Sequence, residues 1–366
     1  MTLQKTTNQK RAILIDLIQP KMSAVQSFER LEELEHLVNT YGGIVVVKKY
    51  QKRFAPHPRT FIGPGKVQEL LEDGEGLGIN LLVINDILKS RQIYTISEQL
   101  RPAGIQVWDR IDLILKIFAK HASTTEARLE IELASIKHMG PRIIGMGMEL
   151  SQQGGGIGTV GLGETNTEIM RRHLRAREQK IKEKLEKCVK ARALHQANRR
   201  RRDFRTVAIV GYTNAGKTSL LNALTRRKEY VADELFATLD TRVGKLYLPE
   251  KKSVVLLSDT IGFIKNLPPE LIKAFSSTLS EAVNADLLLQ VVDGSDKNAE
   301  QQMAVVDDIL NKLGVLSTPR IVVFNKKDAA GKERQRTLGE SLPENLSFLW
   351  VSTLTREGLD DLIKML

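Results

Sequence analysis

Residues 211–218 read GYTNAGKT and match the pattern GxxxxGK[ST], in which a glycine-rich turn leads to a lysine and a hydroxyl. Such a turn binds phosphate, because backbone N–H groups close around the phosphate oxygens and the next helix adds partial positive charge at its start. TVAIV before the turn is typical of a strand and SLLNAL after it of a helix, which is the context that the motif requires. We therefore predict that Lys217 reaches the β- and γ-phosphates of a nucleotide and that the Thr218 hydroxyl ligates Mg²⁺.

A second segment, SVVLLSDTIGFI, ends an apolar strand with residues suited to the metal and the terminal phosphate. At the end of this strand the Asp259 carboxylate can interact with the groups that ligate Mg²⁺ without ligating the ion itself. Gly262 has no side chain, so its N–H can approach the γ-phosphate. Phe263 follows at the place where enzymes with this phosphate-binding turn can carry a water-orienting glutamine. A phenyl ring can neither position nor polarise water, so we predict slow intrinsic hydrolysis; the alternative role for Phe263 is packing within a switch segment.

Two further strand ends predict the base. RIVVFNKKD places Asn325, Lys326 and Asp328 after an apolar run, and the Asp328 carboxylate can accept hydrogen bonds from guanine N1–H and its exocyclic amine. Adenine offers neither donor in this pattern. WVSTL adds Ser352 and Thr353, whose backbone can meet the carbonyl oxygen of the base. These segments in this order predict a GTPase.

The composition is that of a globular protein with a concentrated basic segment. The chain has 366 residues, 42% of them hydrophobic, and a single cysteine, which excludes a disulfide framework and fits a reducing cytoplasm. No secretory leader and no apolar run of membrane-spanning length is evident. Residues 171–205 hold 15 Lys and Arg against 4 Asp and Glu, a balance of 15 − 4 = +11 that equals the net charge of the whole chain. Such a concentration indicates contact with phosphate backbones or anionic lipid, and a solvated helix face is the plain alternative.

Alternation of strands and helices predicts a small parallel α/β domain at the N-terminus. AILIDLI, GGIVVVKK, LLVIND and GIQVWD are typical of strands, and SFERLEELEHLVNTYG and KVQELLED between them have helical spacing. Two longer helical segments follow, TTEARLEIELASIKHM and residues 164–202. Their apolar stripes need each other for burial, so we predict an antiparallel hairpin.

Between these helices, residues 151–166 read SQQGGGIGTVGLGETN. The glycines at 156, 158 and 161 match GxGxxG, but no clean strand precedes them and the nucleotide site is already complete 50 residues away, so a dinucleotide turn is disfavoured. A flexible linker is the other alternative. We interpret the segment as the tip of the hairpin.

The same segments carry a resemblance to a known family. SQQGGGIGTVGLGET, GYTNAGKT, LFATLDT, DTIGFI and NKKD, with DRIDLILKIFAKHA before the hairpin, are similar to the HflX family, in the Obg–HflX group of translation GTPases, over about residues 40–366. The resemblance implies binding to the large ribosomal subunit and separation of stalled or idle ribosomes into subunits. Members usually have Pro and two Thr after LFATLD, which this chain lacks; Thr238 stays the best switch residue for Mg²⁺ and the γ-phosphate, with Thr241 second. The chain ends at Leu366, so a short C-terminal extension of some relatives is expected to be absent.

The predicted site residues follow. The catalytic residues are Lys217, Thr238 and Gly262, and the metal ligands are Thr218 and Thr238. The GTP-binding residues are Gly211, Tyr212, Thr213, Asn214, Ala215, Gly216, Lys217, Thr218, Ser219, Asp259, Gly262, Asn325, Lys326, Asp328, Ser352 and Thr353. Asn214 suggests K⁺ beside the phosphates, since related GTPases with Asn there often bind it. The residues expected to contact RNA at the tip and along the basic helix are Gly154, Gly155, Gly156, Gly158, Arg171, Arg172, Arg175 and Arg177.

FIGPGKVQEL at residues 61–70 leaves two interpretations open: a second nucleotide site, because a glycine pair with Lys66 opens a helix, or a structural turn. We expect three domains: α/β at 1–115, the basic hairpin at 116–203 and a Ras-like P-loop GTPase domain at 204–366. The expected protein is a cytoplasmic monomer that binds GTP, GDP and the large ribosomal subunit, requires Mg²⁺ and does not bind DNA. The alternatives are a signalling GTPase that recruits a protein partner, its basic helix lying weakly on a membrane surface, and an ATP-using RNA remodeller acting through the N-terminal domain.

Overall fold

Four short apolar segments at the N-terminus form a fully parallel sheet in the computed structural model, which describes residues 9–153, 166–201, 204–225, 242–265, 271, 279–344 and 346–366. The strands are β1 (Arg11–Ile18), β2 (Ile44–Lys52), β3 (Leu81–Ile84) and β4 (Gln106–Asp109), in the order β2-β1-β3-β4. A parallel sheet needs helices on both faces, which explains why β1 and β3 are apolar without alternation. The predicted N-terminal α/β domain is confirmed.

The helices of this domain begin and end where the sequence supplies capping residues. They are α1 (Ala24–Tyr41), α2 (Pro64–Leu77), α3 (Ser90–Leu100), the 3₁₀ turn η1 (Arg101–Ala103) and α4 (Arg110–His121). Ser23 and Gln26 form a reciprocal capping box at the start of α1, and Gly42, in the left-handed region at φ 96°, ends it. Helices α2 and α3 pack on the sheet face that carries Ile13, Ile15 and Leu82.

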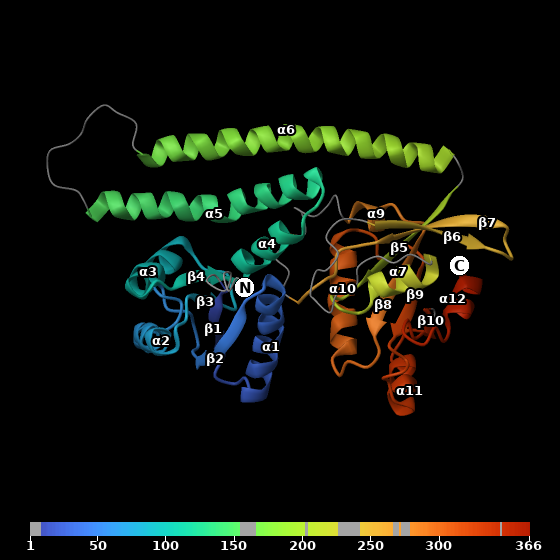
Figure 1. The fold of residues 1–366 in the computed structure, drawn as a ribbon, viewed down its shortest axis with the longest axis horizontal. Helices are drawn as coiled ribbons and strands as arrows, with labels where there is room; N and C mark the ends of the chain where they lie inside the picture. The colour runs from blue at the N-terminus through green and yellow to red at the C-terminus, as the bar shows by residue number, and fades with distance from the viewer. Residues whose placement is uncertain are drawn as a thin grey trace, which may run out of the picture. The chain divides into compact units, whose positions relative to one another are not determined.

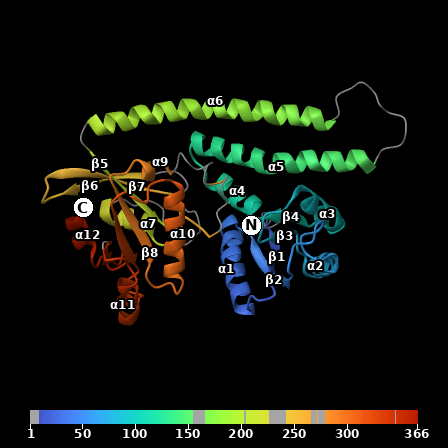
Figure 2. The ribbon, with the colours of Figure 1, turned by 180° about the vertical axis from the view of Figure 1, so that it is seen from behind.

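Two long helices follow, α5 (Thr125–Gln153) and α6 (Asn166–Arg201), and they run antiparallel side by side (Figures 1 and 2). Glu132 and Arg177 pair across them at 2.5 Å, and a Cβ on Gly140 would lie 3.6 Å from a methyl carbon of Leu174. The predicted helical pair is confirmed, with one difference: α5 does not end near Met139 but continues through Pro141 to Gln153. The glycine-rich segment 154–165 lies outside the described residues.

The C-terminal part contains a six-stranded sheet in the order β10-β9-β8-β5-β7-β6, with β6 alone antiparallel to its neighbour. The strands are β5 (Arg205–Gly211), β6 (Arg242–Leu248), β7 (Ser253–Asp259), β8 (Leu287–Asp293), β9 (Arg320–Asn325) and β10 (Ser347–Trp350). The helices are α7 (Lys217–Thr225), α9 (Ser280–Val283), α10 (Ala299–Lys312), α11 (Lys332–Glu340) and α12 (Leu359–Met365). Parallel β5, β7, β8 and β9 end at one edge of the sheet, where α/β proteins bind ligands.

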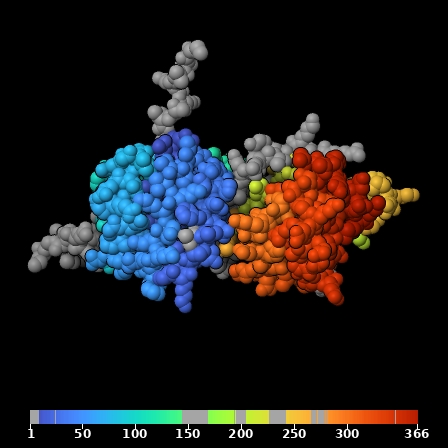
Figure 3. Space-filling model, turned by 90° about the horizontal axis from the view of Figure 1, so that it is seen from below, coloured from blue at the N-terminus to red at the C-terminus, as the bar shows by residue number. Residues whose placement is uncertain are grey.

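The chain divides into two compact units. The first holds the N-terminal sheet with the parts of α5 and α6 in residues 131–153 and 166–184, and the second holds the six-stranded sheet with the remaining parts of both helices. In the space-filling view the N-terminal residues, in blue, and the C-terminal residues, in orange and red, each form a closely packed body (Figure 3). The three-domain boundaries expected above stay a prediction. Among the described residues, no helix combines the length and the apolar character needed to cross a membrane.

Candidate functional site

The turn between β5 and α7 is built around glycines that admit no side chain. A Cβ on Gly211 would lie 2.2 Å from the carbonyl oxygen of Val291, and a Cβ on Gly216, at φ 90°, would lie 2.2 Å from Nδ2 of Asn325. Asn214 also lies in the left-handed region, at φ 62°. This backbone path joins the end of β5 to the start of α7 at Lys217. Residues 211–218 therefore have the strand-turn-helix arrangement that the motif requires.

Lys217 is buried inside this loop. Its Nζ donates to the carbonyl oxygens of Tyr212 at 2.6 Å and Gly211 at 3.2 Å. Burial lowers the pKa of Lys217 to about 8, and the charge of Asp259 only partly offsets that effect. A desolvated ammonium group held by backbone carbonyls has a strong interaction to gain from an anion, because it lacks the hydration that a surface lysine has.

Thr218 and Asp259 offer oxygen ligands at one point. The Thr218 hydroxyl donates to Oδ2 of Asp259 at 2.7 Å, and the Asp259 side chain is fully buried at the end of β7. The buried hydroxyl of Thr213, in the loop, has no hydrogen-bond partner among the described residues. Mg²⁺ prefers carboxylate and hydroxyl oxygens together with phosphate, so these residues fit a magnesium–nucleotide complex. Thr238 and Thr241, the predicted switch residues, lie outside the described residues.

The segment after β7 lies against the phosphate loop. A Cβ on Gly262 would lie 2.7 Å from the methyl carbon of Thr213 and 3.0 Å from Nζ of Lys217, so only glycine fits there. Phe263 N–H donates to Gly211 O at 3.1 Å, and Thr213 N–H donates to Phe263 O at 2.8 Å. The Phe263 side chain is fully buried. Its ring therefore packs in the interior, as the packing interpretation expects, and the slow intrinsic rate stays a prediction.

The predicted base-recognition residues come together across three loops. Asn325 connects them, because its Nδ2 donates to Ala215 O at 3.1 Å and its Oδ1 accepts from Thr353 N–H at 3.2 Å. The Ser352 hydroxyl donates to Oδ1 of the exposed Asp328 at 2.5 Å. The Ser352 hydroxyl thus orients the Asp328 carboxylate.

One residue of this site was missed by sequence reasoning. Asp293, at the end of β8, pairs with Nζ of Lys326 at 2.6 Å, and its Oδ1 accepts from the backbone N–H and hydroxyl of Ser295. Lys326 itself lies in the left-handed region, at φ 60°. An acid that ends an apolar strand, as in LLLQVVD, was the available signal, and it is the same signal that identified Asp259.

The predicted RNA-contacting residues are only partly described. Gly154, Gly155, Gly156 and Gly158 lie outside the described residues. On α6, Arg172, Arg175 and Arg177 are exposed and Arg171 is half-buried. Arg177 pairs with Glu132 on α5, and the pair is itself exposed. An exposed ion pair contributes little stability, so this guanidinium can exchange its carboxylate for a phosphate.

Comparison with known proteins agrees with this architecture. Residues 28–119 match the family described as GTP-binding GTPase N-terminal, 121–199 the GTP-binding GTPase middle region, and 206–326 the 50S ribosome-binding GTPase family. The chain is 43% identical to "GTPase HflX" of Caldanaerobacter subterraneus subsp. tengcongensis, over 98% of this chain and 80% of that protein. It is 35% identical to "GTPase HflX" of Escherichia coli, over 93% and 79%.

A solved structure has the same overall organisation. The crystal structure of a GTP-binding protein from the hyperthermophilic archaeon Sulfolobus solfataricus, in complex with GDP, matches with a TM-score of 0.51 at 27% identity and covers 97% of both chains. The shared architecture therefore extends over the N-terminal sheet, the helical pair and the six-stranded sheet.

Proposed function

The chain belongs to the HflX family of GTPases, and we propose that it uses GTP binding and hydrolysis to bind the large ribosomal subunit and split stalled or idle ribosomes in the cytoplasm. The observation that carries this proposal is the position of the basic helix α6, which follows the glycine-rich segment and leads directly into β5 of the GTP site. One continuous segment thus connects a surface suited to RNA with the start of the phosphate loop.

The charge of α6 supports RNA as the partner. Residues 171–205 carry the whole net charge of +11, and the arginines near the start of α6 are mostly exposed. Ribosomal RNA presents dense phosphates, and each contact with Arg or Lys releases condensed counterions. Gly154, Gly155, Gly156 and Gly158 would let the backbone approach packed RNA closely, since they have no side chain to exclude it. The match of residues 206–326 to a family described as ribosome-binding is consistent with this partner.

Hydrolysis is proposed to rest on positioning and electrostatics, because phosphoryl transfer needs little covalent chemistry from the protein. Lys217 would hold the β- and γ-phosphates, and the Gly262 N–H would donate to the γ-phosphate. Thr218 and Thr238 would hold Mg²⁺, which neutralises charge on the phosphate oxygens when it is bound. Asn214 is the residue that would place K⁺ beside the same phosphates.

We infer that the intrinsic rate is slow and that ribosome docking raises it. The side chain that follows Gly262 is a buried phenyl group and cannot orient the attacking water. Another group has to orient the attacking water. Ordering of the switch segments on the ribosome would bring such a group into place. Steady-state GTP hydrolysis with and without large subunits measures this difference; an isolated protein that is as fast as the ribosome-bound one contradicts the inference.

The decisive experiment is co-sedimentation with purified large ribosomal subunits. We expect the protein to pellet with them in a non-hydrolysable GTP analogue and to be released in GDP. Vesicles of phosphatidylserine and phosphatidylcholine are the matched anionic control. Equal pelleting in both nucleotides, or GTP-dependent binding to the vesicles alone, would overturn the proposal in favour of a signalling role at a membrane.

A deletion variant tests the hairpin tip. Removal of residues 154–163 is expected to leave GTP affinity unchanged, because every residue assigned to the phosphates or the base lies after residue 204. Subunit splitting, followed by light scattering, should be lost, while stimulation of GTP hydrolysis falls only in part because α6 still supports docking. Splitting at the wild-type rate would exclude the tip role, and loss of GTP binding would restore the nucleotide interpretation of the glycine-rich segment.

A further inference from the structure

Helix α5 contains a Gly140–Pro141 pair in its interior, twelve residues before its end at Gln153. Proline has no N–H, so the carbonyl of Lys137 loses its helical hydrogen bond, and the ring crowds the preceding turn. Kinks in helices occur at such sites. The segment of α5 after this pair, residues 142–153, which we name the distal segment, precedes the glycine-rich segment in the chain. We call the missing backbone hydrogen bond at Pro141 the break, although α5 continues through it. The direction of the distal segment then depends on the contacts that hold the helix on either side of the break.

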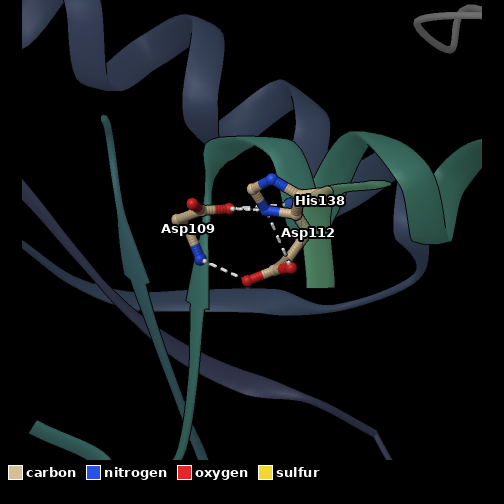
Figure 4. A group of neighbouring side chains, drawn as sticks. All are labelled: Asp109, Asp112 and His138. Carbon is tan, nitrogen blue, oxygen red and sulfur yellow. Dashed lines mark hydrogen bonds and ion pairs between the residues drawn. The ribbon is translucent and has the colours of Figure 1, made fainter. Parts of the chain in front are cut away.

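Two cationic side chains flank the break and bind the same two carboxylates. Figure 4 shows His138 pointing between Asp109 and Asp112, with Nε2 at 3.2 Å from Oδ1 of Asp109 and 3.3 Å from Oδ1 of Asp112. Arg142, one turn further along the helix, donates Nη1 to Oδ2 of Asp112 at 2.8 Å and Nη2 to Oδ2 of Asp109. Residues four apart share a helix face, so both ends of the break are held on one side.

The carboxylates of Asp109 and Asp112 are also held by hydrogen bonds from backbone groups outside α5. Asp109 ends β4 and Asp112 lies in the first turn of α4, where they cap each other's backbone: Asp112 N–H donates to Asp109 Oδ1 at 2.8 Å, and Asp109 N–H donates to Asp112 Oδ2 at 3.1 Å. Leu88 N–H also donates to Asp109 at 3.1 Å. Arg142 extends the contact to the carbonyl of Leu88 at 3.3 Å. The helix is therefore bound to the end of β4, to the first turn of α4 and to the segment between β3 and α3.

The charges of this cluster balance without a metal ion. Burial acts to lower the pKa of His138, but hydrogen bonds to Asp109 and Asp112 raise it to about 9, so the imidazole is charged at neutral pH. Two carboxylates then face one imidazolium and one guanidinium. Ligand atoms of Asp109, Asp112 and His138 lie within 4.8 Å of one another, close enough for a cation. A metal ion would have to displace Arg142 and remove the proton of His138, and both changes oppose its binding.

We propose that Asp109, Asp112, His138 and Arg142 form a clasp that closes over the Gly140–Pro141 break and sets the direction of the distal segment relative to the N-terminal sheet. His138 and Arg142 are positioning residues: they direct the hairpin without touching nucleotide or RNA. Only the biological role of the clasp, which is to present the hairpin tip to the ribosome, rests on the proposed function. Its structural effect exists in the isolated protein.

The test measures the direction of the distal segment by spin-label distances in the full-length protein. Labels are attached through Glu98→Cys on α3 and Glu149→Cys on the distal segment, in a Cys188→Ser background. The matched control pair is Glu98→Cys with Lys137→Cys, before the break. We expect Arg142→Gln to broaden the first distance distribution and to leave the control distribution narrow. An unchanged first distribution, or equal broadening of both, overturns the clasp.

A second substitution separates the clasp from general loss of structure. Pro141→Ala restores the N–H and the missing helical hydrogen bond, so we expect it to narrow the distribution again in the Arg142→Gln protein. Asp109→Asn combined with Arg142→Gln removes the pair without leaving a buried charge alone, and it is expected to broaden the distribution as Arg142→Gln does. Failure of Pro141→Ala to narrow the distribution would show that the break is not what the clasp controls.

Two further measurements distinguish the remaining outcomes. Uptake of one equivalent of Mn²⁺ by the wild-type protein, lost in Asp109→Asn, would make the cluster a metal site and refute the clasp. In the Arg142→Gln protein, subunit splitting should fall while GTP hydrolysis without ribosomes stays unchanged. If spin labels show the broadening but the wild-type protein never binds large subunits, the proposed function fails and the clasp stands.

Discussion

Replacement of Lys217 by methionine is expected to stabilise the protein without nucleotide while it abolishes GTP binding. Burial holds the pKa of Lys217 at about 8, against 10.5 for an ordinary lysine. This difference of about 2.5 units corresponds to roughly 3 kcal/mol of unfavourable free energy for the charged side chain in the fold. Lys217→Met removes that cost because a thioether side chain fills similar space without charge.

The lost hydrogen bonds offset part of this gain. Lys217 donates to the carbonyls of Gly211 and Tyr212, and two such bonds contribute about 1 kcal/mol each. Both carbonyls keep a backbone donor, from Phe263 and Ala215 respectively, so neither is left unpaired. The net stabilisation is then about 1–2 kcal/mol, or an increase of roughly 2–8 °C in Tm for a unit of this size. With GTP at 100 times its Kd the order reverses, because the wild type alone gains about 2.7 kcal/mol.

The pH dependence of the stability difference between the two proteins gives an independent check that buried Lys217 destabilises the fold. Since the folded pKa lies below the unfolded one, the penalty is fully present below about pH 8 and disappears as the pH rises from 8 to 10.5. Thermal unfolding of both proteins, with and without GTP, at several pH values measures the difference, in which all other titrations cancel. The reasoning is refuted if Lys217→Met is the less stable protein at pH 7 without nucleotide, or if the difference does not shrink toward pH 10.

Three further outcomes are expected. Asp328→Asn should weaken GTP binding by about 1.5–3 kcal/mol, the value of hydrogen bonds to a charged group, and should favour xanthine nucleotides; unchanged affinity in a GTP titration would remove Asp328 from the base site. Four arginines on α6 are to be replaced by glutamine together: Arg171, Arg172, Arg175 and Arg177. This change should flatten the salt dependence of large-subunit binding and leave the GTPase rate of the isolated protein unchanged. If binding keeps the same dependence on salt concentration, these arginines serve only solubility. His138 faces Asp109, Asp112 and Arg142, and its raised folded pKa means that its stabilisation is complete below pH 6.5 and lost as the pH rises through about 9; stability of the wild type relative to His138→Asn should fall over this range, and a flat difference would contradict the ion pairs.

Much of the GTP site could be predicted from the sequence because its parts are local. Residues 211–218 form a contiguous motif whose glycines allow one backbone path, and the structure gives that path. Asp259 and Asn325 each end an apolar strand, and parallel strands end at one edge of the sheet. Once these strands are recognised as parallel, their last residues can be predicted to lie together, whatever the loops between them.

Other features were decided only by tertiary structure. The pair Gly140–Pro141 argues locally against a helix, yet α5 continues through it, since contacts from Asp109 and Asp112 hold the turns on both sides. The pairing of Asp293 with Lys326 likewise joins two strand ends 33 residues apart (326 − 293 = 33). The period of hydrophobic residues and the capping residues predict only the local structure within a few positions along the chain. A charge that is neutralised by a residue distant in the chain leaves no periodic signal, and its partner is known only when the strands and helices have packed.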